Sequence, residues 1–203
     1  MTSITLYSNP RSRGRIARWM LEEVGADYDV AWIDFDNPGQ VAEFRTVNPM
    51  AKVPAIRHGD AVVTETAAIC AYLADAFADA ALAPPVARRA DYYRWLFFAA
   101  GPLEAAITNQ AMGVQPTPEQ QGFVGYGDLA RTLDTLETAL AGASWIAGDR
   151  FTAADVYVGS QIGFGLQFGT IDKRPAFADY VARATDRDAY RRAAEADDGA
   201  IAG

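Results

Sequence analysis

The chain has 203 residues, more than one typical domain and fewer than two; half of them are hydrophobic and 22% are charged. This composition excludes intrinsic disorder, a collagen-like fibre and a membrane bundle. The formal net charge of −8 repels phosphate backbones, so we expect no nucleic-acid partner.

The chain carries one cysteine, Cys70, and one histidine, His58. A single cysteine cannot form an internal disulfide and is typical of a reducing compartment. No signal-peptide pattern is visible, and no apolar run approaches the ~20 residues that span a bilayer. We therefore expect a cytoplasmic protein without a membrane partner. A zinc site needs about four Cys or His ligands, so no metal site is expected.

Strand and helix patterns alternate through residue 79. Strands are predicted at 4–7, 28–35, 53–57 and 61–64; helices are predicted to begin at Ser12, to cover 41–47, and to begin at Glu65 or Thr66. The order is β-α-β-α-β-β-α, and the first crossover helix requires its two strands to pair in parallel. His58 is predicted to be exposed in the hairpin turn, and Cys70 to be a small buried hydrophobe.

The clearest break in the chain is the run at 80–85, which ends in Pro84-Pro85. Paired prolines cannot continue a helix and favour an extended linker. Only helical periods follow the break. We therefore predict an α/β domain over residues 1–79, a linker over 80–86 and an all-helical domain over 87–203.

The second part begins with a long predicted helix at 86–112, with a kink expected at Gly101-Pro102. A loop rich in Gly, Pro and Gln covers 113–125. The next helix is marked by leucines spaced four, three and four residues apart, at Leu129, Leu133, Leu136 and Leu140. Residues 152–155, Thr-Ala-Ala-Asp, predict a capping box, and two shorter helices follow residue 175.

Four local signals occur in an informative order: the turn at 8–13, Val53-Pro54, Glu65-Thr66 and the segment 145–155. Together they resemble the cytosolic glutathione transferase family, in which a thioredoxin-like N-terminal domain precedes an all-helical domain. Residues 48–56 (NPMAKVPAI) are similar to the family's loop before its cis-proline strand. Residues 64–73 (TETAAICAYL) resemble its Glu-Ser helix start, with Thr66 in place of Ser. The resemblance covers nearly the whole chain and implies a serine-type, bacterial-like homodimer that acts in detoxification.

The resemblance implies a glutathione site formed by Lys52, Val53, Pro54, Glu65 and Thr66. Glutathione is anionic and peptide-like, so its carboxylates suit the backbone donors of a helix N-terminus, where Thr66 stands. Glu65 is expected to take the ligand's ammonium group, and Lys52 its glycyl carboxylate. The Val53 backbone, held by a cis bond to Pro54, is expected to pair with the cysteinyl backbone as an added strand would.

In this interpretation the nucleophile is the thiolate of glutathione, a co-substrate, and no cofactor is required. A free thiol titrates near ~8.5, and lowering its pKa by two units requires about 2.7 kcal/mol. One hydrogen bond to a charged acceptor contributes about 1.5–3 kcal/mol, and a helix N-terminus adds about 0.3–1 kcal/mol. One hydroxyl at the start of the first helix is therefore enough.

Ser12 is the first candidate for that hydroxyl, because it lies five residues past Tyr7, as the activating serine does in serine-type members. It is equally suited to cap the helix. Ser8 and Asn9 are the alternatives: Ser8 matches the family's Ser-x-Pro pattern, and Asn9 offers an amide donor. Tyr7 resembles the tyrosine of tyrosine-type members but ranks lower, because it precedes a serine-rich turn.

Tyr93 and Phe97 are the candidates for the electrophile site, because the aromatic residues of the long helix cannot all face one core. The expected reaction is attack of the thiolate on a small hydrophobic electrophile or a peroxide. The alternative is a non-catalytic module on the same fold that binds glutathione or a protein. A thiol oxidoreductase would need a low-pKa cysteine at the first helix, and none is present there.

Overall fold

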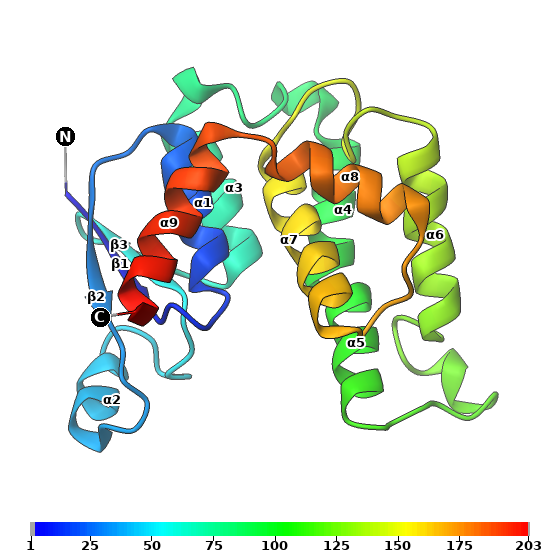
Figure 1. The fold of residues 1–203 in the computed structure, drawn as a ribbon, viewed down its shortest axis with the longest axis horizontal. Helices are drawn as coiled ribbons and strands as arrows, with labels where there is room; N and C mark the ends of the chain where they lie inside the picture. Colours follow the sequence, from blue (N-terminus) through cyan, green and yellow to red (C-terminus); the bar gives the residue numbers. More distant parts are fainter. Residues whose placement is uncertain (1–2, 203) are drawn as a thin grey trace. The chain divides into compact units, whose positions relative to one another are not determined.

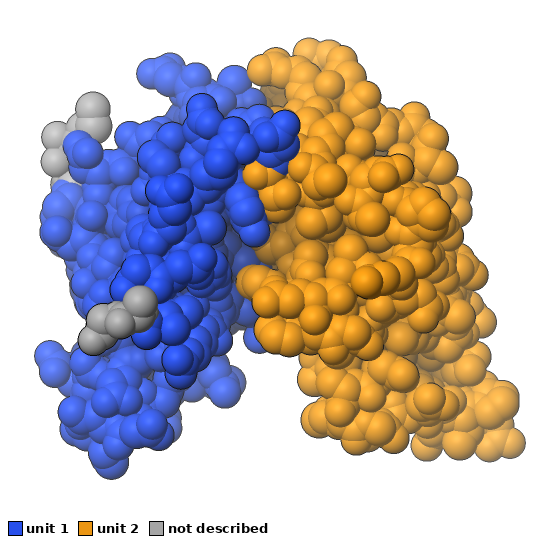
Figure 2. Space-filling model, in the orientation of Figure 1, with its two compact units in different colours: residues 1–82, 186–203 blue, residues 83–185 orange. Residues whose placement is uncertain are grey.

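The computed structural model describes residues 3–202 and divides into two compact units. Unit 1 comprises residues 1–82 and 186–203, and unit 2 comprises residues 83–185 (Figure 2). Within the described part of the chain, no helix is long and apolar enough to cross a bilayer.

Unit 1 is built on a four-stranded mixed sheet in the order β2-β1-β3-β4. Its elements are β1 (Ile4–Ser8), α1 (Gly14–Val24), β2 (Tyr28–Trp32), α2 (Pro38–Phe44), β3 (Ala55–His58), β4 (Ala61–Thr64), α3 (Thr66–Ala76) and a short 3-10 turn, η1 (Ala78–Ala80). β1 pairs in parallel with β2 and antiparallel with β3, which pairs antiparallel with β4. The predicted thioredoxin-like order and the parallel first pair are confirmed.

Several element boundaries differ from the predictions. Helix α1 begins at Gly14, so Ser12 lies in the turn before it. Helix α2 begins at Pro38 because the Asn37 side chain accepts hydrogen bonds from the backbone N–H groups of Gly39 and Gln40. An asparagine cap followed by proline is a recognised helix start, and the prediction over 41–47 overlooked it.

The last helix, α9 (Asp188–Ala202), packs against α1 in unit 1 (Figure 1). The Arg18 guanidinium donates to the Asp197 carboxylate at 2.9 Å, and both side chains are buried. Arg187 makes a two-pronged ion pair with Glu23 at 2.6 and 2.7 Å. The predicted all-helical domain over 87–203 includes this helix, because the periodicity of a helix does not specify which surface it covers.

Unit 2 is all-helical, as predicted. Its elements are η2 (Val86–Arg88), α4 (Ala90–Phe98), η3 (Ala99–Leu103), α5 (Glu104–Ala111), η4 (Gln120–Gly122), α6 (Leu129–Ala141), α7 (Ala153–Phe168) and α8 (Pro175–Thr185). The predicted long helix is interrupted by η3, a π-helical turn that contains Pro102. Proline has no N–H group for the regular helical ladder, which explains the irregular turn.

Helix α7 begins with the predicted capping box. The Asp155 carboxylate accepts four hydrogen bonds: from the backbone N–H groups of Ile146 and Thr152, and from the hydroxyls of Thr152 and Tyr180. Burial raises the pKa of Asp155, and its hydrogen-bond donors oppose that shift. Asp155 therefore ties the loop at 146, the start of α7 and helix α8 to one point.

We predict that Asp155→Ala lowers the free energy of unfolding by about 3 kcal/mol or more, because four donors lose a buried acceptor. The control is Asp128→Ala at the start of α6, where a partly exposed carboxylate caps a single backbone N–H group. That loss should be about 1 kcal/mol. Urea denaturation followed by circular dichroism measures both, and equal losses would contradict the central role of Asp155.

Candidate active site

Strand register brings three predicted segments to one end of the sheet in unit 1. Tyr7 on β1 is opposite Ala55 on β3, and Ala55 is opposite Thr64 on β4. The turn after β1 and the start of α3 come shortly after Tyr7 and Thr64, and the loop before β3 comes directly before Ala55. The segments that contain Ser12, Val53 and Glu65 therefore lie at the same end of the sheet.

The loop before β3 is organised by Asn48, which is 4% exposed. Its side-chain amide donates to the Lys52 carbonyl at 2.7 Å, and its side-chain oxygen accepts from the Met50 N–H group at 3.1 Å. The Val53-Pro54 peptide bond is cis, as predicted. Lys52 is exposed and Val53 is partly buried, so the loop presents both residues at the end of the sheet.

Glu65 and Thr66 form the entry to α3. Glu65 has φ 64° and ψ 117°, an uncommon backbone conformation for a residue with a side chain. Its side chain is exposed and makes no capping hydrogen bond to the helix, whereas Thr66 is buried. A strained backbone that presents an exposed carboxylate at a helix N-terminus is a feature that points to function.

The turn after β1 is held by Asn9 and Ser12. The Asn9 amide donates to the Ile33 carbonyl at 3.0 Å, and its side-chain oxygen accepts from the Arg11 N–H group. The Ser12 hydroxyl donates to the Asn9 carbonyl at 2.6 Å and accepts from the Gly14 N–H group at 2.9 Å. Ser12 is partly exposed, so its oxygen combines a capping role with access to a ligand.

Ser8 and Asn9, the two alternatives to Ser12, differ from it in burial and in hydrogen bonding. Ser8 is 0% exposed, and its hydroxyl oxygen has no hydrogen-bond partner among the described residues. Complete burial denies it direct contact with a ligand. One N–H of the Asn9 side-chain amide donates to the Ile33 carbonyl, which fixes the orientation of that side chain. Ser12 and Asn9 are both partly exposed, and Ser12 is the one whose hydroxyl also accepts from the N–H group of the first residue of α1.

Comparisons with known proteins give the family. The models described as glutathione S-transferase, N-terminal domain, and glutathione S-transferase, C-terminal domain, match residues 2–75 and 104–183. Glutathione S-transferase GstA of Escherichia coli is 30% identical over 158 residues, which are 75% of this chain and 78% of that protein. The chain belongs to the glutathione S-transferase family.

Solved structures of glutathione transferases share the fold. One from Methylococcus capsulatus aligns with a TM-score of 0.79 and 31% identity, over 96% of this chain and 98% of its own. A sphingomonad glutathione S-transferase, solved in complex with glutathione, aligns with a TM-score of 0.76 and 27% identity, over 95% and 98%. The disulfide-bond oxidoreductase YghU of Escherichia coli is 30% identical over 183 residues, which are 83% of this chain and 63% of that protein. The relatives of this chain are therefore named for two activities, glutathione transfer and disulfide-bond oxidoreduction.

In unit 2 the aromatic candidates Tyr93 and Phe97 lie one turn apart on α4, and hence on one side of the helix. Their exposed fractions are 42% and 73%. The Tyr93 hydroxyl accepts a hydrogen bond from Arg89 at 3.2 Å. Phe97 therefore provides the more exposed apolar surface of the two.

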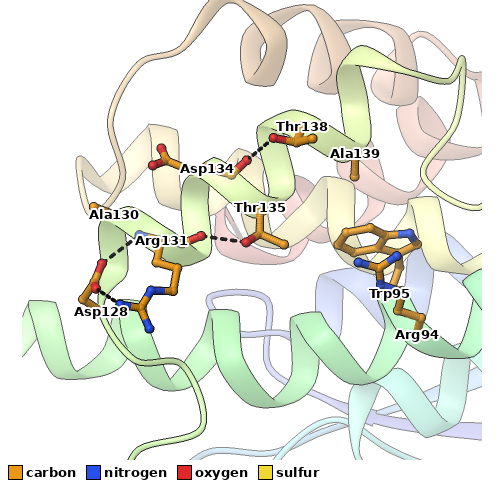
Figure 3. Close-up of a pocket in the computed structure, with 9 residues that line it drawn as sticks. All are labelled: Arg94, Trp95, Asp128, Ala130, Arg131, Asp134, Thr135, Thr138 and Ala139. Atoms are coloured by element: carbon orange, nitrogen blue, oxygen red, sulfur yellow. Dashed lines mark hydrogen bonds and ion pairs between the residues drawn. The ribbon is translucent and has the colours of Figure 1, made fainter. Parts of the chain in front are cut away.

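An open groove of about 670 Å³ lies between α4 and α6 (Figure 3). Trp95 and the aliphatic parts of Thr135 and Ala139 line it, and Arg131 forms an ion pair with Asp128 at its rim. None of the predicted site residues lines this groove. Among residues 3–202, no group of three or more His, Cys, Asp or Glu side chains is arranged to hold a metal ion.

His58 and Cys70 have structural roles. His58 is partly buried: its Nδ1 lies 3.0 Å from the Tyr72 hydroxyl, and its ring stacks on Phe77. The prediction of an exposed turn histidine was wrong, because α3 and the turn after it cover that end of the hairpin. Cys70 is buried as predicted, and burial raises the pKa of its thiol to about 12. A thiol with that pKa is a poor nucleophile at neutral pH.

Sequence reasoning missed two positions that shape this part of the glutathione S-transferase fold. No role was predicted for the Asn48 side chain within the 48–56 segment, although this side chain holds the loop before Pro54. Gly14 was not singled out, although a Cβ there would lie 1.9 Å from the Ser8 hydroxyl oxygen. The Asn-Pro dipeptide at 48–49 was the available signal for the first, and nothing local signals the second.

Proposed function

We propose that this protein is a glutathione transferase that activates the glutathione thiol with Ser12. The observation that supports this best is the register across β1, β3 and β4, which gathers the Ser12, Val53 and Glu65 segments at one edge of the sheet. A peptide-like thiol needs a strand edge, a carboxylate for its ammonium group and a donor for its sulfur. These three segments offer all of them.

The proposed contacts follow from the chemistry of each residue. The exposed Glu65 carboxylate receives the γ-glutamyl ammonium group, while the hydroxyl and N–H group of Thr66 at the start of α3 receive the adjacent carboxylate. The backbone of Val53 pairs with the cysteinyl residue, as in strand addition. Lys52, exposed beside it, meets the glycyl carboxylate.

Ser12 then acts on the sulfur. Its hydroxyl leaves the Asn9 carbonyl and donates to the thiolate, while the Gly14 N–H group continues to donate to the Ser12 oxygen. The thiol proton passes to solvent, and the thiolate forms a bond to the electrophilic atom. The leaving group departs with the electron pair of its bond, or the pair remains on the acceptor when the reaction is an addition. One such hydrogen bond contributes about 1.5–3 kcal/mol, which is enough to lower the thiol pKa by one to two units.

Tyr93 and Phe97 are proposed to contact a small hydrophobic electrophile, or a peroxide in a side reaction. The lone buried cysteine is consistent with a cytoplasmic enzyme that acts in detoxification.

A second candidate activity is glutathione-dependent disulfide reduction, which the name of one relative favours. A non-catalytic module that binds glutathione or a protein is the third possibility, and the absence of any thiol pKa shift would favour it.

Glutathione binding is tested with the double variant Glu65→Ala, Thr66→Ala. Affinity should fall about a hundredfold or more, since two polar contacts to a charged ligand are lost. Asp60→Ala is the control, because Asp60 is an exposed acid in the turn at the other end of the β3–β4 hairpin. Isothermal titration calorimetry measures the dissociation constants. Unchanged affinity in the double variant would refute the proposed site.

Thiol activation is tested with Ser12→Ala. The pKa of the thiol of bound glutathione should rise by about one to two units, and turnover near neutral pH should fall about ten- to a hundredfold. A thiolate absorbance titration measures the pKa, and thermal melts are recorded in parallel. If the titration curves of the two proteins overlay while only the melting temperature falls, Ser12 is a cap and Asn9 is the next residue to change.

We also predict a homodimer in solution, formed between the first domain of one subunit and the helical domain of the other. A domain of about 80 residues has a limited core of its own and gains from such burial. Sedimentation equilibrium at micromolar concentration should give about twice the 21.9 kDa mass of one chain. A species of single-chain mass across that range would contradict the prediction.

A further inference from the structure

The Ser8 hydroxyl is a buried polar group without a partner. Ser8 is 0% exposed, and its oxygen contacts no hydrogen-bond partner within residues 3–202. Its backbone carbonyl is engaged, because it accepts from the Ile33 N–H group at 2.8 Å. Unpartnered buried hydroxyls are rare in folded proteins, and one that persists calls for a reason.

The Ser8 hydroxyl occupies the space that a side chain on Gly14 would need. A Cβ on Gly14 would lie 1.9 Å from the Ser8 oxygen and 3.0 Å from the Ser12 oxygen. Both hydroxyls therefore face the same side of the Gly14 backbone. The Ser8 Cβ would also lie 3.0 Å from that added Cβ, so a side chain at position 14 has no room beside position 8. The hydroxyl and the glycine instead bring a free O–H group next to the proposed thiol activator.

The hydrogen bonds of Ser12 change when it acts. In the present structure its oxygen accepts from the Gly14 N–H group and its proton goes to the Asn9 carbonyl. A serine oxygen has two lone pairs, so one acceptor position is left beyond the Gly14 contact. When the Ser12 proton points to a thiolate, negative charge spreads onto its oxygen and makes it a better acceptor.

We propose that Ser8 is a positioning residue for thiol activation: its hydroxyl donates to the Ser12 oxygen when Ser12 donates to the thiolate. The chain of two hydroxyls polarises the Ser12 O–H bond and holds it toward the sulfur. Ser8 touches no ligand in this arrangement and acts only through Ser12. The inference rests on the proposed function and adds a residue to it.

The test is a double-mutant cycle with Ser8→Ala, Ser12→Ala and the combined variant. In the wild-type background, Ser8→Ala should raise the pKa of the bound glutathione thiol by about 0.3 to 0.5 units, a two- to threefold fall in its acid dissociation constant. In the Ser12→Ala background it should cause no further shift. Turnover of Ser8→Ala and wild type should converge at pH values above both thiol pKa values, where the thiol is fully ionised.

Stability separates this role from a structural one. Since Ser8→Ala removes an unpartnered hydroxyl and no hydrogen bond, its melting temperature should equal or exceed that of the wild type. Ser8→Thr keeps the hydroxyl and should keep the wild-type thiol pKa. Ser160→Ala is the matched control: it removes a serine hydroxyl that donates to the Val156 carbonyl in unit 2, and should leave the thiol pKa unchanged.

Two outcomes overturn the inference by itself: an unchanged thiol pKa in Ser8→Ala when Ser12→Ala does shift it, or equal shifts from Ser8→Ala in both backgrounds. If glutathione does not bind, or if Ser12→Ala leaves the thiol pKa unchanged, the proposed function fails and the inference fails with it. The single variants therefore distinguish the two failures.

Discussion

The antiparallel pairing of β3 with both β1 and β4 is the constraint on which the rest of the candidate site depends. Because Tyr7, Ala55 and Thr64 are paired in one row across the sheet, three segments that are distant in sequence meet at the same end of the sheet. A shift of β3 by one residue would reverse the faces of its side chains and move the loop before it. Ala55 and Ile56 are both buried, on opposite faces of the sheet, so such a shift would exchange a small and a large side chain between two packed layers.

In the turn after β1, the Ser12 hydroxyl both orders the start of α1 and is the proposed donor to the thiolate. In the structure, Ser12 bonds both to the Asn9 carbonyl and to the Gly14 N–H group, and so it orders the start of α1. Donation to a thiolate would exchange the first of these bonds for a charge-assisted one, which is stronger. Helix α9 pairs with α1 through Asp197 to Arg18 and through Asp198 to Arg15, and Arg15 also donates to the Pro10 carbonyl in the turn. The C-terminal helix is therefore linked to the turn through Arg15 although it is remote in sequence.

Local signals predicted much of this molecule, and long-range packing accounts for what they missed. The alternation of strands and helices, the capping box at Thr152 and Asp155 and the strand that follows Pro54 are local patterns, and the structure confirms them. The docking of α9 on α1 depends on ion pairs between residues more than 160 positions apart, such as Arg187 with Glu23. The partial burial of His58 depends likewise on Tyr72 and Phe77, which no pattern around the histidine reveals. At the site, sequence similarity indicated Val53, Glu65 and Ser12, but the contrast between a buried Ser8 and an accessible Ser12 required coordinates.

The central claim is that glutathione binds where the three segments leave the sheet. Backbone amide shifts in a two-dimensional nuclear magnetic resonance titration with glutathione test it most directly. The account predicts that the largest changes lie in residues 8–14, 51–55 and 64–68, with little change around the hairpin turn at 58–61. Changes centred on that turn or on the groove between α4 and α6, with the three segments unaffected, would contradict it.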